Sequence, residues 1–185
     1  MLRCPLHMVI ITHFSRYINP ETGKIHICGQ QHPACPKCNS TMKFRDTCNR
    51  HCKDKESKCT WYVLRRFECC DSTHREIPDF LFPFKHYEAD VVQSVIDGNT
   101  DGIAADESTI RCWRRQWKTQ EERIRLVLMA FLMQVHNDIS KLIGTSSDII
   151  ILIRKKYLRW LSFVLRMLIH GCIPLYTQFA FCHSP

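Results

Sequence analysis

Cysteine is the residue that most constrains this sequence, because it is abundant and concentrated in one part of the chain. Nine of the 12 cysteines fall within the first 70 of 185 residues. A secreted disulfide scaffold would need an export signal, and the start of the chain has only a short apolar run, Met8 to Thr12, between two histidines. Thiols stay reduced in the cytosol, so clustered cysteines there more often bind a metal than form disulfides. We therefore expect a cytoplasmic protein with a metal site.

Two pairs of cysteines have the separation of a four-ligand zinc site. Cys35 and Cys38 form a Cys-x2-Cys knuckle, a tight turn that lets two thiolates bind one Zn²⁺. Cys69 and Cys70 follow about one hairpin later. Because these two are adjacent, His74 is an alternative fourth ligand that would give a Cys₃His site. We predict a zinc ribbon with one structural Zn²⁺ and favour the four sulfurs as its ligands; a region of buried free thiols is the plainer alternative.

A further group of ligand-type residues lies between the two pairs. The stretch around it is polar, and we expect it at the tip of a hairpin. Its Cys-x2-His-Cys spacing would permit a second metal, but exposed thiols in a variable loop are the better interpretation. The group consists of Cys48, His51, Cys52 and Cys59.

After the cysteine region the apolar spacing becomes that of helices. Four helices are predicted, between Lys85 and Gly98, from about Glu107 to Lys118, from a capping box at Thr119 to Gly144, and from about Asp148 to His170. The expected fold class is α+β, a small N-terminal zinc-ribbon-like β unit followed by a four-helix region that contains a helix-turn-helix. Its parts would be an N-terminal arm or hairpin (1–33), the zinc-ribbon-like unit (34–84), a helix-turn-helix-like pair (85–118), and a C-terminal helical hairpin with a tail (119–185).

The predicted helix at 107–118 has one apolar and one cationic face. Ile110, Trp113 and Trp117 form the apolar stripe, and the opposite stripe is wholly cationic. The net charge of +8 also favours a polyanionic partner. A recognition helix presents its N-terminal side chains to bases and its cations to phosphates. We predict DNA binding, with a merely solvated basic face as the alternative, through Ser108, Thr109, Arg111, Arg114, Arg115 and Lys118.

The chain resembles a family of uncharacterised bacterial proteins in two segments, HREIPDFLFPFKHYEADVVQSVIDG and ADESTIRCWRRQW. That family joins a pair of zinc knuckles to a basic helix, and is similar in layout to the N-terminal DNA-binding regions of insertion-sequence transposases. The resemblance extends over about residues 35–181. It implies the two cysteine pairs and a basic helix with Arg111, Arg114 and Arg115, although Cys112 stands where the family usually has arginine.

We expect no catalytic activity. A transposase core needs three carboxylates on a large sheet. Only 67 residues follow Lys118, which is too few for such a sheet, and the acids after Arg123 are Asp138 and Asp148. The expected function is zinc-stabilised DNA binding, in a mobile genetic element or in transcriptional control. A thiol-rich metal-handling or redox protein is the alternative.

The last predicted helix has a polar stripe on an apolar surface. We expect a core helix of a small bundle, with a membrane-surface helix as the alternative. Its charges rule out a bilayer span, and its apolar area would suit a homodimer interface. The stripe consists of Lys155, Arg159, Ser162, Arg166 and His170.

Overall fold

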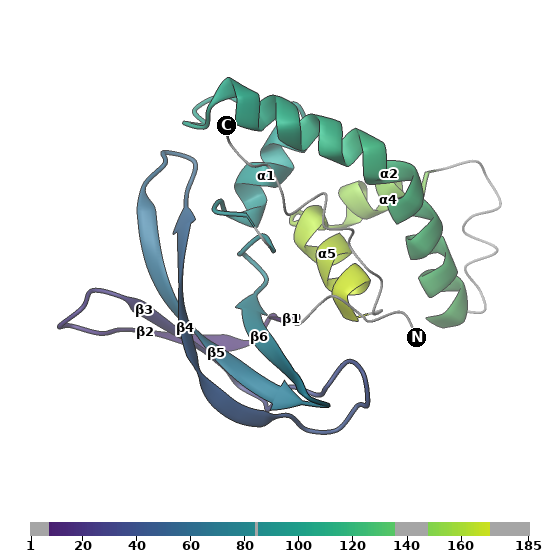
Figure 1. Cartoon of the computed structure of the whole chain (residues 1–185). Helices are drawn as coiled ribbons and strands as arrows, with labels where there is room; N and C mark the ends of the chain where they lie inside the picture. Colours follow the sequence, from purple (N-terminus) through teal and green to yellow (C-terminus); the bar gives the residue numbers. More distant parts are fainter. Residues whose placement is uncertain (1–7, 84, 136–147, 171–185) are drawn as a thin grey trace.

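The computed structural model describes residues 8–83, 85–135 and 148–170. In these residues a curled six-stranded sheet forms most of the N-terminal part, and four helices lie together beside one of its faces (Figure 1). The fold is therefore mixed α+β. The predicted end of the third helix near Gly144 and the chain after His170 lie outside the described residues.

The sheet runs in the order β1-β6-β5-β3-β2, and β4 pairs with the remaining edge of β5. The strands are β1 (Met8–Ile11), β2 (Phe14–Ile18), β3 (Ile25–Gly29), β4 (Lys43–Lys53), β5 (Cys59–Cys69) and β6 (Ser72–Pro78). β5 is central because both of its edges are paired. One edge is antiparallel to β4 along nearly its whole length, and the other pairs with β3 in parallel and with β6 in antiparallel orientation. This sheet includes strands from both sides of residue 33.

Strand β4 corrects the expectation of a variable loop. The polar stretch around Cys48 and Cys52 is an 11-residue strand, and the tip of the hairpin is the short segment 54–58. Most β4 side chains are exposed or half-buried, and β4 pairs with β5 along one of its two edges. An edge strand of this kind lacks the apolar alternation by which strands are predicted from sequence.

One face of the sheet carries the main hydrophobic core. Side chains alternate along a strand, so Tyr62 and Leu64 of β5 point to the same side, where they join apolar residues from the helices. The helices contribute three tryptophans, Trp113, Trp117 and Trp160, which are all buried. Trp117 and Trp160 meet edge to face, with ring centroids 5.1 Å apart.

The helices are α1 (Ala89–Ile96), α2 (Glu107–Val135), α4 (Ile149–Lys156) and α5 (Trp160–His170). The predicted boundary between Lys118 and Thr119 is wrong, because α2 continues through it. The hydroxyl of Thr119 donates to the carbonyl of Arg115 one turn earlier instead of capping a new helix. The predicted helix-turn-helix is not confirmed: α2 has 29 residues, and the connection from α1 runs over residues 97–106.

The predicted last helix is divided in two. Tyr157 is extended, with φ −121° and ψ 120°, and ends α4. Gln93 of α1 satisfies the backbone at the break, because its amide donates to the carbonyl of Leu158 and accepts from the N–H of Leu161. The chain therefore turns at this point and α5 enters the core.

The polar stripe predicted on this segment is divided: Lys155 is exposed, whereas Arg159 and Ser162 contact the protein body. The buried apolar residues of α5 agree with the expected core helix. Ser162 is buried and donates to the carbonyl of Asp79, and Arg159 pairs with Asp79 and Asp90. Among the described residues, no helix has the length and apolar character needed to cross a membrane.

Candidate metal centre and cationic surface

The first cysteine pair lies in a tight loop before β4. Cys35 donates its N–H to the carbonyl of Ser40 and accepts the N–H of Asn39 at its own carbonyl, each at 2.8 Å. Asn39 has φ 59°, a left-handed conformation that asparagine tolerates well. The N–H of Lys37 points at the sulfur of Cys35, 3.4 Å away. The loop thus has the amide-to-sulfur geometry expected of a knuckle.

The second pair occupies the two-residue turn between β5 and β6. Cys69 ends β5 opposite Ser72, and the turn residues Cys70 and Asp71 have φ 51° and 54°. Two successive residues with positive φ make the primed turn that fits the twist of a hairpin. A left-handed non-glycine residue costs roughly 1–2 kcal/mol. This turn is the local device that brings adjacent cysteines to one site.

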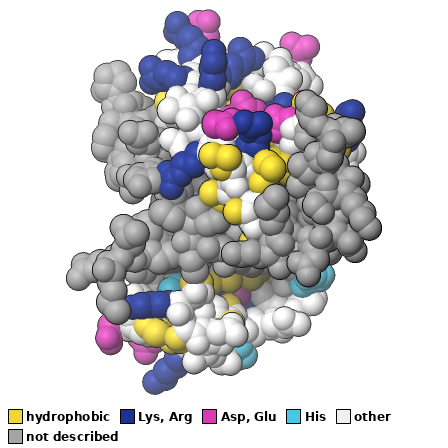
Figure 2. Space-filling view, turned by 90° about the vertical axis from the view of Figure 1, so that its right-hand side faces the viewer, with side chains coloured by type: hydrophobic (Ala, Val, Ile, Leu, Met, Phe, Trp, Pro, Cys, Tyr) yellow, Lys and Arg dark blue, Asp and Glu magenta, His cyan; other side chains and the backbone are white. Residues whose placement is uncertain are grey.

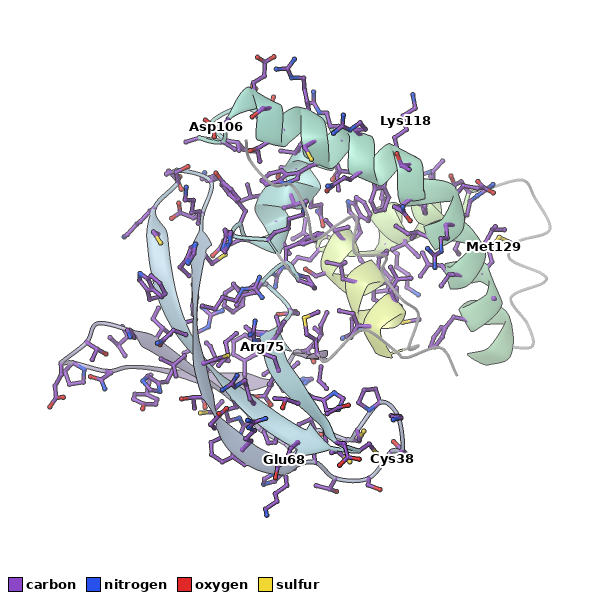
Figure 3. All side chains as sticks on the ribbon, viewed as in Figure 1. Cys38, Glu68, Arg75, Asp106, Lys118 and Met129 are labelled. Atoms are coloured by element: carbon purple, nitrogen blue, oxygen red, sulfur yellow. The ribbon has the colours of Figure 1, made fainter. Side chains whose placement is uncertain are left out.

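The two turns meet at one end of the sheet, close to the labelled Cys38 in Figure 3. The sulfur of Cys38 lies 3.5 Å from that of Cys69, and the sulfurs of Cys69 and Cys70 are 3.7 Å apart. All four sulfurs, including that of Cys35, lie within 4.8 Å of one another. A tetrahedral Zn–S site with bonds of about 2.3 Å needs sulfurs about 3.8 Å apart. The four cysteines therefore fit a single tetrahedral metal ion.

Hydrogen bonds favour a thiolate at the exposed Cys38. The backbone and side chain of Ser40 donate to its sulfur and, with the neighbouring thiols, lower the pKa of Cys38 to about 6. The thiol of Cys69 donates to Cys38, which raises the pKa of Cys69 to about 12. The raised pKa values of Cys69 and Cys70 and the lowered pKa of Cys38 mean that Cys38 ionises before these two thiols. Sequence reasoning did not single out Ser40, because nothing in its spacing marks it as a donor.

His74 stands beside the cluster. Its ring is buried, and its Nε2 is 4.0 Å from the sulfur of Cys35. This position suits a residue that orients the Cys35 ligand. The ligand atoms that lie close enough together for one metal ion belong to the four cysteines and do not include His74.

The other candidate ligand group, for which the sequence did not favour a metal, is not brought together. Cys48 and Cys52 point to one face of β4, while His51 between them points to the other, because side chains alternate along a strand. Burial raises the pKa of Cys52 to about 12, which disfavours the thiolate that metals bind. In the described part of the chain, the four-cysteine cluster is the one group of His, Cys, Asp or Glu ligand atoms close enough together to hold a metal ion.

The metal cluster adjoins a small hydrophobic cluster separate from the main core. Its buried members are Cys35, Met42 and Phe67, with Val9 and Cys69 packed against them. With three buried side chains, the apolar core at this end of the sheet is much smaller than the main core.

The predicted cationic face of α2 is exposed. Trp113 contacts Tyr87 edge to face, with centroids 5.0 Å apart, and anchors the opposite side of the helix. Two of the cations are engaged nearby: Arg114 donates to the carbonyl of Val95, and Arg111 lies 3.9 Å from Glu107. The solvent-exposed side chains of this segment are Ser108, Arg111, Arg114, Arg115 and Lys118, and Thr109 is half-buried.

Lysine and arginine side chains gather toward the top of the molecule in Figure 2, the edge that α2 forms in Figure 1. Lys118 projects away from the body there, whereas Cys38 lies at the opposite end (Figure 3). The metal centre therefore does not support α2 directly.

Comparison with known proteins gives one similarity. Residues 35–113 match a family described as a domain of unknown function (DUF6431). The match contains both cysteine pairs and ends in the second turn of α2, well short of the predicted limit at residue 181. No curated protein and no solved structure matches the chain. The resemblance to transposase regions stays a prediction.

Proposed function

We propose that this chain is a zinc-stabilised DNA-binding protein without catalytic activity of its own. The observation that carries the proposal is the exposed cationic segment of α2, which has no acid between Ser108 and Gln120. Cations spaced on one side of a helix can meet successive phosphates, and Ser108 and Thr109 in the first turn suit contacts to bases or backbone. The predicted resemblance to the DNA-binding regions of transposases leads us to place this activity in a mobile genetic element or in transcriptional control.

Zinc is the metal that the cluster suits best. Four thiolates in tetrahedral geometry form a closed structural site, which leaves no open position for catalysis. The ion would join the loop around Cys35 to the β5–β6 turn and stabilise the end of the sheet whose apolar core is smallest. In this proposal Zn²⁺ supports the fold, and α2 binds the nucleic acid.

A salt series on duplex DNA tests the role of α2. The variant Arg115→Ala/Lys118→Ala removes two exposed cations without disturbing the Arg114 contact to α1. Its affinity should fall, and the slope of log affinity against log salt should decrease by about 2. Lys155→Ala/Lys156→Ala on α4 is the control, because both lysines are exposed and the charge change is the same. Equal slopes for the two variants would refute the assignment to α2.

We also propose a homodimer formed through the C-terminal helices. Leu158, between α4 and α5, is 92% exposed, and Ile151 of α4 is also exposed. Apolar side chains in such positions favour association, and a two-fold dimer would suit a palindromic DNA site. Sedimentation should show a dimer that Leu158→Asp converts to monomer; a wild-type monomer at every concentration would exclude this arrangement.

Metal handling is the second candidate function. It is favoured by the exposure of Cys38 and Cys70, since solvent-accessible sulfurs can pass a metal to another ligand. Metal stoichiometry and exchange distinguish the two proposals. One Zn²⁺ that a competing chelator removes slowly supports a structural site, whereas several metals or rapid transfer to an acceptor thiol supports handling.

A further inference from the structure

The sheet has an open groove on the side away from the main core. It lies between the tips of two hairpins, and its volume is about 430 Å³. The β2–β3 tip contributes Thr22, Gly23 and Lys24, and the β4–β5 hairpin contributes Asn49, Cys59, Thr60 and Trp61. Neither the metal centre nor the cationic face of α2 includes any of these residues.

Trp61 is an exposed aromatic platform at this groove. It is 47% exposed, whereas the other three tryptophans of the chain are buried in the core. The ring of His51 supports it from the neighbouring strand, with centroids 5.1 Å apart, and the ring of His86 stacks on His51 in turn at 4.2 Å. A large indole held open to solvent by a row of rings offers a planar surface for another ring.

A second aromatic platform lies on the same face. The strand register places Tyr17 opposite His26, His26 beside Val63, and Val63 opposite Asn49 of the groove. Paired residues of adjacent strands point to the same side, so Tyr17 shares the face of the groove. Tyr17 is also exposed, and its ring stacks on that of His26 at 4.5 Å.

The polar residues beside Trp61 suit an anionic ligand. Lys24 lines the groove, and its ammonium lies 3.4 Å from the side-chain oxygen of Asn49. No carboxylate of the described residues lines the groove. Glu76, an acid farther along the sheet, is neutralised by its ion pair with Arg65. The groove therefore combines exposed rings, one cation and an amide that can both donate and accept.

We infer that this groove binds single-stranded nucleic acid. Bases would stack on Trp61 and Tyr17, Lys24 would meet a phosphate near Trp61, and Asn49 would hydrogen-bond a base edge. Aromatic stacking with a cationic path for the backbone is the general chemistry of single-strand binding. A duplex does not fit this chemistry, because its bases are already stacked on one another. The inference rests on the proposed function for its ligand class, but assigns an unpaired strand to a surface separate from α2.

Tryptophan fluorescence provides a direct test. An oligothymidylate of about ten nucleotides is titrated into the full-length, zinc-loaded protein. Because Trp61 alone of the four tryptophans is exposed, stacking should quench the emission in a saturable way. Absence of binding, or binding with unchanged emission, would overturn the inference. An oligouridylate run in parallel shows whether the groove prefers DNA or RNA.

Three variants separate the role of Trp61 from folding and from α2. Trp61→Leu should weaken binding about tenfold or more, while Trp61→Phe, which keeps a stacking ring, should remain within a few-fold of wild type. Arg115→Ala/Lys118→Ala should lose duplex affinity and retain the single-strand affinity. If Trp61→Leu, checked for wild-type circular dichroism and zinc content, binds the oligonucleotide as tightly as wild type, the inference is wrong. It is also wrong if only the α2 variant loses single-strand binding.

Discussion

Arg65 and Glu76 form a two-pronged ion pair between β5 and β6, with both N–O distances at 2.8 Å. Glu76 is only 1% exposed. The pair also contacts Gly29 of β3: Arg65 donates to the carbonyl of Gly29, and Glu76 accepts the N–H of Gly29. Three strands are therefore joined between the metal centre and the groove.

Replacing Arg65 with Met should destabilise the protein strongly, because the carboxylate of Glu76 would remain buried without its partner. Loss of one member of a buried ion pair costs about 3–5 kcal/mol. Urea denaturation measures this change. The double variant Arg65→Met/Glu76→Met should recover much of the loss, since it leaves no buried charge; a double variant as unstable as the single one would contradict this explanation.

Gly29→Ala should destabilise the protein through the same ion pair. A Cβ at this position would lie 2.5 Å from Oε1 of Glu76 and 2.9 Å from a guanidinium nitrogen of Arg65. Forcing atoms into such a space typically costs about 1–3 kcal/mol. A double-mutant cycle checks the cause: Gly29→Ala should cost less when Arg65 and Glu76 are both Met. If Gly29→Ala lowers the free energy of unfolding equally in the double-Met variant, the destabilisation comes from the backbone at Gly29 and not from the ion pair.

Lys85 should make stability depend on pH above neutrality. It is only 7% exposed, its ammonium donates to Gln116, and burial lowers the pKa of Lys85 from 10.5 to about 8. Between these values the unfolded chain binds more protons than the folded one, so stability rises with pH. Below about pH 8 the burial penalty is present in full. Lys85→Met abolishes this titration.

Denaturation of both proteins across that range measures the effect of Lys85. Relative to Lys85→Met, the wild type should gain about 2–3 kcal/mol between pH 8 and pH 10.5. The comparison cancels the titration of the cysteines, which both proteins share. A difference that stays constant with pH would show that Lys85 remains charged when buried.

Helix positions were predictable where apolar spacing was strong, and so were outer ends such as Glu107 and Asp148, but whether a helix continues or breaks was not. The stripe of Trp113 and Trp117 placed the first turns of α2 correctly. The capping box at Thr119 was misleading, because a Thr-x-x-Glu pattern also occurs inside a continuous helix, where the hydroxyl bonds the preceding turn. The break at Tyr157 depends on Gln93, a residue more than 60 positions away, and no local pattern contains that information.

The metal cluster was predictable as a set of residues but not as a geometry. Pairing the knuckle at Cys35 with the cysteines one hairpin later was enough to select the four sulfurs that the fold brings together. The adjacent pair suggested strain, since nothing in the sequence indicates that Cys70 and Asp71 adopt left-handed conformations. The groove at Trp61 was missed for a related reason: strand composition indicates a strand but not which of its rings stay exposed.

The competition between Cys70 and His74 for the fourth ligand position gives the last prediction. The sulfur of Cys70 lies within the four-cysteine cluster, whereas Nε2 of His74 is 4.0 Å from the sulfur of Cys35. Cys70→Ser should therefore weaken zinc binding more than His74→Gln, for which loss of an orienting contact costs about 10–100-fold. Chelator competition measures the affinities. The thiolate-to-metal charge-transfer band of the Co²⁺-substituted protein, which grows with the number of thiolate ligands, should fall in Cys70→Ser and stay unchanged in His74→Gln. The opposite pattern in both measurements would make His74 the ligand and leave Cys70 outside the metal site.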